Sequence, residues 1–138
     1  MKRPWGIKEK LGSESSYLSL VLHSYGLMYV KLKKLPQAEP LLVRAATMAG
    51  KQLGSDDAFA GGMLVDLAET YLLMDRYEEG KPLFDRGIRG MEKSLGPDHE
   101  LVLQKLESWS SALRLFDKDD DADQIDRRVA EGRRAKKN

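Results

Sequence analysis

A pattern that repeats every 42 residues is the feature that most restricts how this chain can fold. The dipeptide Leu-Gly occurs three times at that spacing, at Leu11-Gly12, Leu53-Gly54 and Leu95-Gly96. When residues 17–57 are placed over residues 59–99, nine of 41 positions are identical. A fixed period of this length is typical of proteins built from stacked copies of one small unit, each burying its neighbour's apolar face.

Each copy of the repeat predicts two helices separated by a short polar break. In the first copy, apolar residues recur every three or four positions from Leu18 to Leu32, which marks one face of a helix. A second helix is expected to begin near Pro36, because proline is tolerated in a first helical turn. In the next copy the second helix is expected to begin near Glu78. The Leu-Gly pair is expected to end it, since glycine can adopt the left-handed conformation that ends a helix.

Small residues and short polar residues complete this hairpin pattern. Gly26 and Ala38 of the first copy correspond to Ala68 and Gly80 of the second, and they are expected where the two helices of a hairpin come closest. The polar residues after each Leu-Gly pair are expected to form a turn. The side chain of Ser55, Asp57 or Asp98 can accept hydrogen bonds from the free amides of the helix that follows.

The motif in residues 71–99 resembles a known family. It reads Tyr-x5-Tyr-Glu-Glu-Gly-Lys-Pro-Leu-Phe-x-Arg from Tyr71 to Arg86 and closes with Leu95-Gly-Pro-Asp-His99. This motif is similar to the tetratricopeptide repeat of the longer, kinesin-light-chain type, and the similarity extends over residues 17–116. The resemblance implies an all-α fold, a right-handed superhelical solenoid of about three antiparallel helix hairpins.

We divide the chain, as a single domain of residues 1–138, by this repeat. Residues 1–15 are predicted to be a partial N-terminal helix, residues 16–57 the first repeat and residues 58–99 the second. Residues 100–138 are predicted to hold the third repeat, with a capping helix from Asp119 and a frayed tail at Lys136-Lys137-Asn138. The apolar residues of the N-terminal segment are open to three interpretations: a cap, a face for self-association, or the end of a longer array.

Composition and motifs argue against an enzyme. The 138 residues contain no cysteine and two histidines, which excludes thiolate catalysis and zinc–thiolate sites. The segment Asp117-x-Asp119-x-Asp121 lacks the glycine and the closing glutamate of a calcium loop, so it is predicted to be an acidic helix start. No phosphate loop or nucleophile motif is present. We therefore predict no catalytic residue, cofactor or metal site.

The net charge of +1 conceals an uneven distribution along the sequence. Residues 1–51 carry a net +6, residues 52–126 a net −10 and residues 127–138 a net +5. The acidic centre argues against nucleic-acid binding, because it would repel a phosphate backbone. No apolar run is long enough to span a membrane, so a cytoplasmic protein without a membrane partner is expected.

The family resemblance implies a non-enzymatic protein-interaction module that binds a peptide or partner segment in a concave groove lined by the first helices. The partner is expected to carry basic and apolar residues, because acidic residues lie beside apolar ones in this groove. The alternative is a self-associating scaffold or homo-oligomer, or a fragment of a longer array. The predicted groove residues are His23, Ser24, Leu27, Lys31, Val65, Asp66, Glu69, Leu73, Glu107, Ser108, Ser111 and Arg114.

Overall fold

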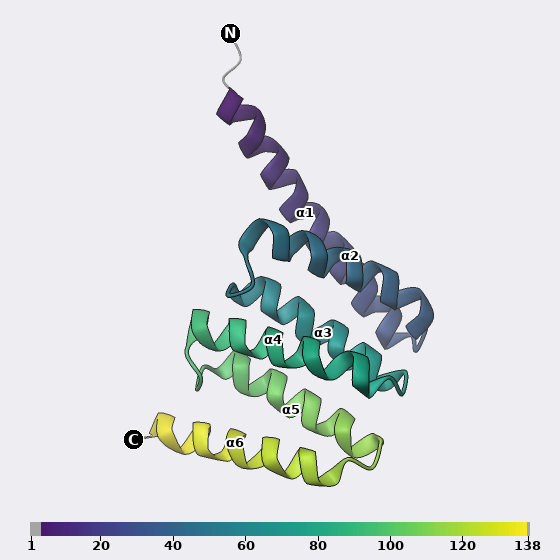
Figure 1. The fold of residues 1–138 in the computed structure, drawn as a ribbon, viewed down its shortest axis with the longest axis vertical. Helices are drawn as coiled ribbons and strands as arrows, with labels where there is room; N and C mark the ends of the chain where they lie inside the picture. Colours follow the sequence, from purple (N-terminus) through teal and green to yellow (C-terminus); the bar gives the residue numbers. More distant parts are fainter. Residues whose placement is uncertain (1–3, 138) are drawn as a thin grey trace.

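The described part of the chain folds into six helices that stack as three hairpins (Figure 1). The computed structural model describes residues 4–137, with side chains from residue 16 onward. No strand is present in that part of the chain, so the all-α prediction is confirmed. The helices are α1 (Pro4–Lys31), α2 (Leu35–Leu53), α3 (Ala58–Leu73), α4 (Tyr77–Leu95), α5 (Glu100–Leu115) and α6 (Asp119–Lys137).

The hairpins are α1–α2, α3–α4 and α5–α6, and each packs on the next in chain order (Figure 1). The predicted starts near Pro36 and Glu78 match the first turns of α2 and α4, and both helices end at a Leu-Gly pair. The acidic segment after Asp117 begins α6, as predicted. The handedness of the superhelix stays a prediction.

The same backbone turn closes all three hairpins. Lys33, Asp75 and Asp117, which are 42 residues apart, have positive φ angles of 61°, 60° and 59°. After each of them, an amide donates to a carbonyl five residues earlier, which is the Schellman arrangement that ends a helix. These hydrogen bonds run from Lys34 to Tyr29 (2.8 Å), from Arg76 to Tyr71 (2.8 Å) and from Lys118 to Leu113 (3.0 Å).

The joints between hairpins depend on glycine. Gly54 and Gly96 have φ angles of 89° and 95°, which favour glycine, although their ψ values are extended and not those of a left-handed helix. Asp57 caps α3 by accepting from the Ala60 amide at 2.9 Å, as predicted. The prediction of Asp98 as the cap of α5 is wrong. His99 caps this helix instead, and Asp98 accepts from Arg128 at 3.3 Å.

The core consists of two apolar clusters along the stack. One lies in the first hairpin and on α3, and it contains four buried alanines of α2 together with Met63 and Leu67 of α3. The other lies between α3, α4, α5 and α6, where the Trp109 ring stacks on the Phe84 ring with centroids 4.3 Å apart. Because α3 contributes to both clusters, it links the three hairpins into one folded unit.

Small residues allow the helices of each hairpin to approach closely, as predicted. A Cβ atom added at Gly80 would lie 2.6 Å from the Ala68 carbonyl oxygen, and one at Gly26 would lie 2.5 Å from a methyl group of Leu42. Ala38 is fully buried. Larger side chains at these positions would push the helix axes apart.

The structure differs from the prediction at both ends of the chain. Helix α1 runs without a break through Leu11-Gly12, where a turn was expected, and its N-terminal half extends beyond α2 (Figure 1). A glycine inside a helix costs about 1 kcal/mol relative to alanine, which does not by itself end a helix. At the other end, α6 continues through Lys136 and Lys137, so they are not frayed; Asn138 lies outside the described residues.

Candidate functional site

One exposed face is shared by the first helices of the three hairpins, α1, α3 and α5, and we call it the first-helix face. Tyr17, Phe59 and Leu101 occupy the same position in the three repeats, and their exposed fractions are 71%, 40% and 50%. Exposed apolar side chains that lie together can form an interaction surface, and Phe59 and Leu101 line the same hollow. This column of residues is therefore the first element of the candidate site.

A hollow of about 370 Å³ opens on the first-helix face beside Phe59 and Leu101. Gly62 contributes to it without a side chain, and Met63, Met91 and Leu95 supply apolar surface. His23, Asp66 and Lys105 also line the hollow. An open apolar depression with a few polar groups at its side is suited to hold an apolar side chain of another molecule.

Asp66 connects the three first helices. Its carboxylate accepts a hydrogen bond from His23 Nε2 on α1 at 2.8 Å and from Lys105 Nζ on α5 at 2.6 Å. Burial raises the pKa of Asp66, but the His23 hydrogen bond and the Lys105 charge outweigh it, so the pKa is lowered overall. The carboxylate is thus ionised and fully engaged, and it holds neighbouring hairpins in register.

Glu69 lies one turn further along α3 and is engaged in a similar way. Both of its carboxylate oxygens lie within 2.9 Å of the Ser108 hydroxyl on α5. Burial raises the pKa of Glu69, the Ser108 hydrogen bond opposes this rise, and the nearby Asp66 charge adds to it. Glu69 therefore joins α3 to α5 and does not stand free on the surface.

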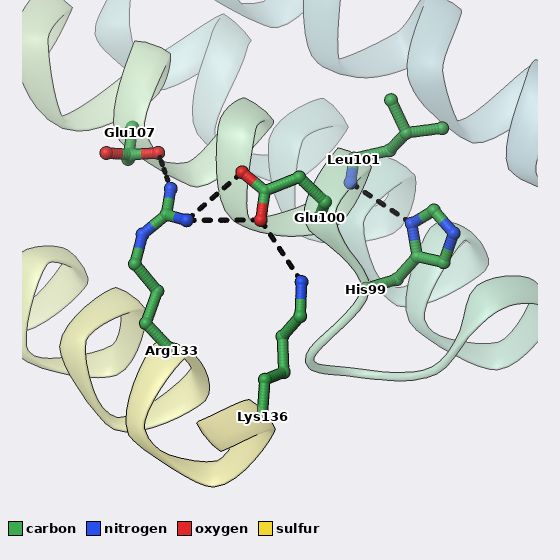
Figure 2. Close-up of polar contacts among 6 residues, drawn as sticks. All are labelled: His99, Glu100, Leu101, Glu107, Arg133 and Lys136. Carbon is green, nitrogen blue, oxygen red and sulfur yellow. Dashed lines mark hydrogen bonds and ion pairs between the residues drawn. The ribbon is translucent and has the colours of Figure 1, made fainter.

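Charges on α5 are neutralised by the last helix. Arg133 of α6 forms ion pairs with Glu107 and with Glu100, the latter at 3.1 Å, and Lys136 also contacts Glu100 at 3.1 Å (Figure 2). All these side chains are about half exposed, so each pair adds little stability. The consequence is mainly electrostatic: the acids on this side of α5 already have cationic partners.

The structure distributes the twelve predicted groove residues over three environments. Exposed positions hold Ser24, Lys31, Glu107, Ser111 and Arg114. Half-buried positions hold His23, Leu27, Asp66, Glu69, Leu73 and Ser108. The prediction for Val65 is wrong, since Val65 is fully buried and belongs to the core cluster with Phe84 and Trp109. Arg114 turns toward α6, where it pairs with Asp123 at 2.8 Å and with Asp126 at 2.5 Å.

Sequence reasoning missed Phe59, Leu101 and Lys105. A signal for the first two was present, because Tyr17, Phe59 and Leu101 repeat at 42 residues and precede the apolar stripe of each first helix. No local signal could assign Lys105, because its partner Asp66 lies 39 residues away in the sequence.

The described residues form neither a cluster of metal ligands nor a helix that could span a membrane. No group of three or more histidine, aspartate or glutamate side chains has an arrangement that could hold a metal ion. Among the helices described, none combines the length and the apolar character needed to cross a bilayer.

Three stacked helical hairpins define the class of the protein, an α-helical repeat protein. Residues 62–100 match the family model described as tetratricopeptide repeat. The match identifies a tetratricopeptide repeat in this part of the chain, and such repeats are in general non-catalytic modules for protein–protein interaction. No curated protein matches the chain.

Proposed function

We propose that the chain is a protein-interaction module that binds a segment of a partner protein along the first-helix face. The observation that carries this proposal is the exposed apolar column of Tyr17, Phe59 and Leu101, with the hollow beside it. Apolar side chains of the partner enter this hollow and displace water from Phe59 and Leu101. Contacts of this kind provide most of the free energy of binding in peptide grooves.

The character of the partner follows from which groups are still available for binding. The three acidic residues of the predicted groove already have partners inside the protein. Asp66 contacts His23 and Lys105. Glu69 contacts Ser108, and Glu107 contacts Arg133. A basic partner would have to compete with these internal contacts. We therefore propose that apolar anchors determine affinity, and that basic residues of the partner contribute mainly to the rate of association.

The test uses peptides selected on the protein itself. A library of random 12-residue peptides is displayed and selected on the wild-type chain, and the enriched peptides are titrated by fluorescence anisotropy. The binding variant is Phe59→Ala with Leu101→Ala. The control is Val43→Ala with Leu53→Ala, because both control residues are comparably exposed apolar side chains on α2.

We expect enriched peptides to carry two or more apolar residues. We also expect the Phe59 and Leu101 variant to weaken their binding by roughly tenfold to a hundredfold, with no change for the control. Equal affinities for all three proteins would place binding elsewhere on the molecule. Failure to enrich any peptide would also contradict the proposal.

A further inference from the structure

Helix α1 carries an exposed apolar stripe on the side away from α3, and we call it the α1 seam. Leu32 is 57% exposed and Tyr25 is 55% exposed, and neither has a covering helix within the described part of the chain. Part of this stripe borders a shallow hollow of about 370 Å³ that Tyr17 and Met28 also line. The residues of the seam are Leu18, Val21, Tyr25, Met28 and Leu32.

The repeat shows that a helix normally covers these positions. Tyr25 corresponds to Leu67 of α3 and Trp109 of α5, which are only 4% and 1% exposed. Leu18 corresponds to Ala60 and Val102, which are also buried. In α3 and α5, the second helix of the preceding hairpin provides the cover. The α1 seam therefore has the geometry of an interhelical contact but lacks its partner.

The spacing of the seam specifies the shape of the missing partner. Its residues follow one another at intervals of three, four, three and four, which is the heptad spacing of paired helices. The same spacing continues backwards in the sequence, across Glu14, to Leu11 and Ile7. Helix α1 has 28 residues, whereas α2 and α4, the covering helices inside the stack, have 19 each, so a helix of their length would leave part of α1 uncovered.

The other end of the stack does not match the seam. Ala46 of α2 and Ile88 of α4 are buried against the next hairpin, and the corresponding residue of α6 is the exposed Ala130. Around it lie three exposed cations, Arg127, Arg134 and Lys137. Burying unpaired cations against an apolar seam is costly, so α6 of another copy is a poor partner for α1. A head-to-tail chain of copies is thus disfavoured.

We infer that two copies of this chain pair through their α1 seams and form a symmetric dimer. The second α1 supplies a helix of equal length with the same heptad spacing, so each seam residue finds an apolar partner. The pairing is self-complementary, and it closes after two copies because each chain has one α1. The seam borders the proposed peptide site only at Tyr17, and the inference does not use Phe59 or Leu101, so the two proposals can be tested separately.

The test measures the mass of the full chain in solution by size-exclusion chromatography with light scattering. The protein concentration runs from about 1 to 100 µM, so that a dissociation constant in the micromolar range can be detected. The seam variant is Tyr25→Lys with Met28→Lys. The control is Val43→Lys with Leu115→Lys, which adds the same charge at exposed apolar positions on α2 and α5. Circular dichroism checks that the helix content of each variant equals that of the wild type.

We expect the wild type and the control to reach twice the chain mass of 15.6 kDa, and the seam variant to stay at the monomer mass. The dimer dissociation constant should rise by roughly a hundredfold or more in the seam variant, because two ammonium groups would be buried without partners. A second variant, Tyr25→Ser, removes apolar contact without adding charge and should weaken the dimer less.

Three results would overturn the inference. A wild-type chain that remains monomeric over the whole range would show that the seam does not pair with itself. A seam variant that dimerises as well as the control would place the interface elsewhere. A mass that grows beyond two copies with concentration would indicate head-to-tail association.

Discussion

Asp66 is the single residue on which the alignment of the first helices most depends. It accepts from His23 and Lys105 across distances of 43 and 39 residues in the sequence, and its side chain is only 12% exposed. Removing one member of a half-buried charged network leaves the other members without partners. The resulting loss of stability exceeds that caused by removing one exposed ion pair.

Replacing Asp66 with asparagine should lower the free energy of unfolding by about 1–3 kcal/mol at pH 7, measured by urea denaturation. The control is Asp56→Asn, whose exposed pair with Lys93 is 3.5 Å long and should contribute less than about 0.5 kcal/mol. Similar losses for the two variants would show that the Asp66 network adds no stability.

The effect of Asp66 should also depend on pH. Because folding lowers the pKa of Asp66 below its ordinary value of 3.8, the stabilisation is fully present above that value and is lost as the pH falls through the folded-state pKa. The difference in stability between the wild type and Asp66→Asn should therefore shrink in acid. A difference that stays constant from pH 7 down to pH 2 would contradict this account.

Local features of the sequence were sufficient to predict the elements. The spacing of apolar residues, Pro36 and the Leu-Gly pairs each act within one or two helical turns. They located the starts and the ends of α2 and α4, but the turn that they predicted at Leu11-Gly12 is helical. The site was predicted less well, because its contacts join residues about 40 positions apart. The error at Val65 shows how strongly the burial of a helix residue depends on its exact position. Successive residues are rotated by about 100° around the helix axis, so Val65 is buried and the neighbouring Asp66 is half-buried.

The contact between α3 and α4 offers a matched pair of glycine substitutions. A Cβ atom at Gly87 would lie 2.5 Å from the Gly61 carbonyl oxygen, whereas a Cβ atom at Gly62 would meet nothing within 4 Å. Gly87→Ala should lower the free energy of unfolding by about 1–3 kcal/mol, because the helices must move apart. Gly62→Ala should raise it by about 0.5–1 kcal/mol through helix propensity.

Thermal and urea unfolding of the two glycine variants should therefore shift in opposite directions. If Gly87→Ala were as stable as the wild type, the close approach of α3 and α4 would be tolerant of a larger side chain. If Gly62→Ala were less stable than the wild type, the added methyl group would be meeting a neighbour, which contradicts the open space around Gly62 in the structure.

At the scale of the whole molecule, stability is expected to be highest in the middle of the stack. Helix α3 takes part in both core clusters, whereas α1 has an uncovered seam and α6 has an exposed outer side. In a linear array each hairpin is stabilised by its neighbours, so the end hairpins open more easily than the central one.

Hydrogen exchange should show this gradient. We expect the amides of α3 to exchange at least about tenfold more slowly than those of α6 and of α1, measured at a protein concentration where the chain is monomeric. At higher concentration, pairing through the α1 seam should slow exchange in α1 while α6 stays unchanged. Uniform exchange over all six helices would contradict the gradient.

The two joints between hairpins show how the order of the repeats is encoded. Their glycines have nearly the same backbone angles, so the main chain alone would allow one hairpin to replace another. Their side chains differ in size, because α2 presents alanines to α3, whereas α4 presents Phe84 and Ile88 to α5. A copy of residues 58–99 inserted after itself would place these large side chains against Ala60 and Leu67. The hairpins thus have the same backbone geometry, but their side chains do not allow one hairpin to replace another. Extending the array would require new side chains at each added joint.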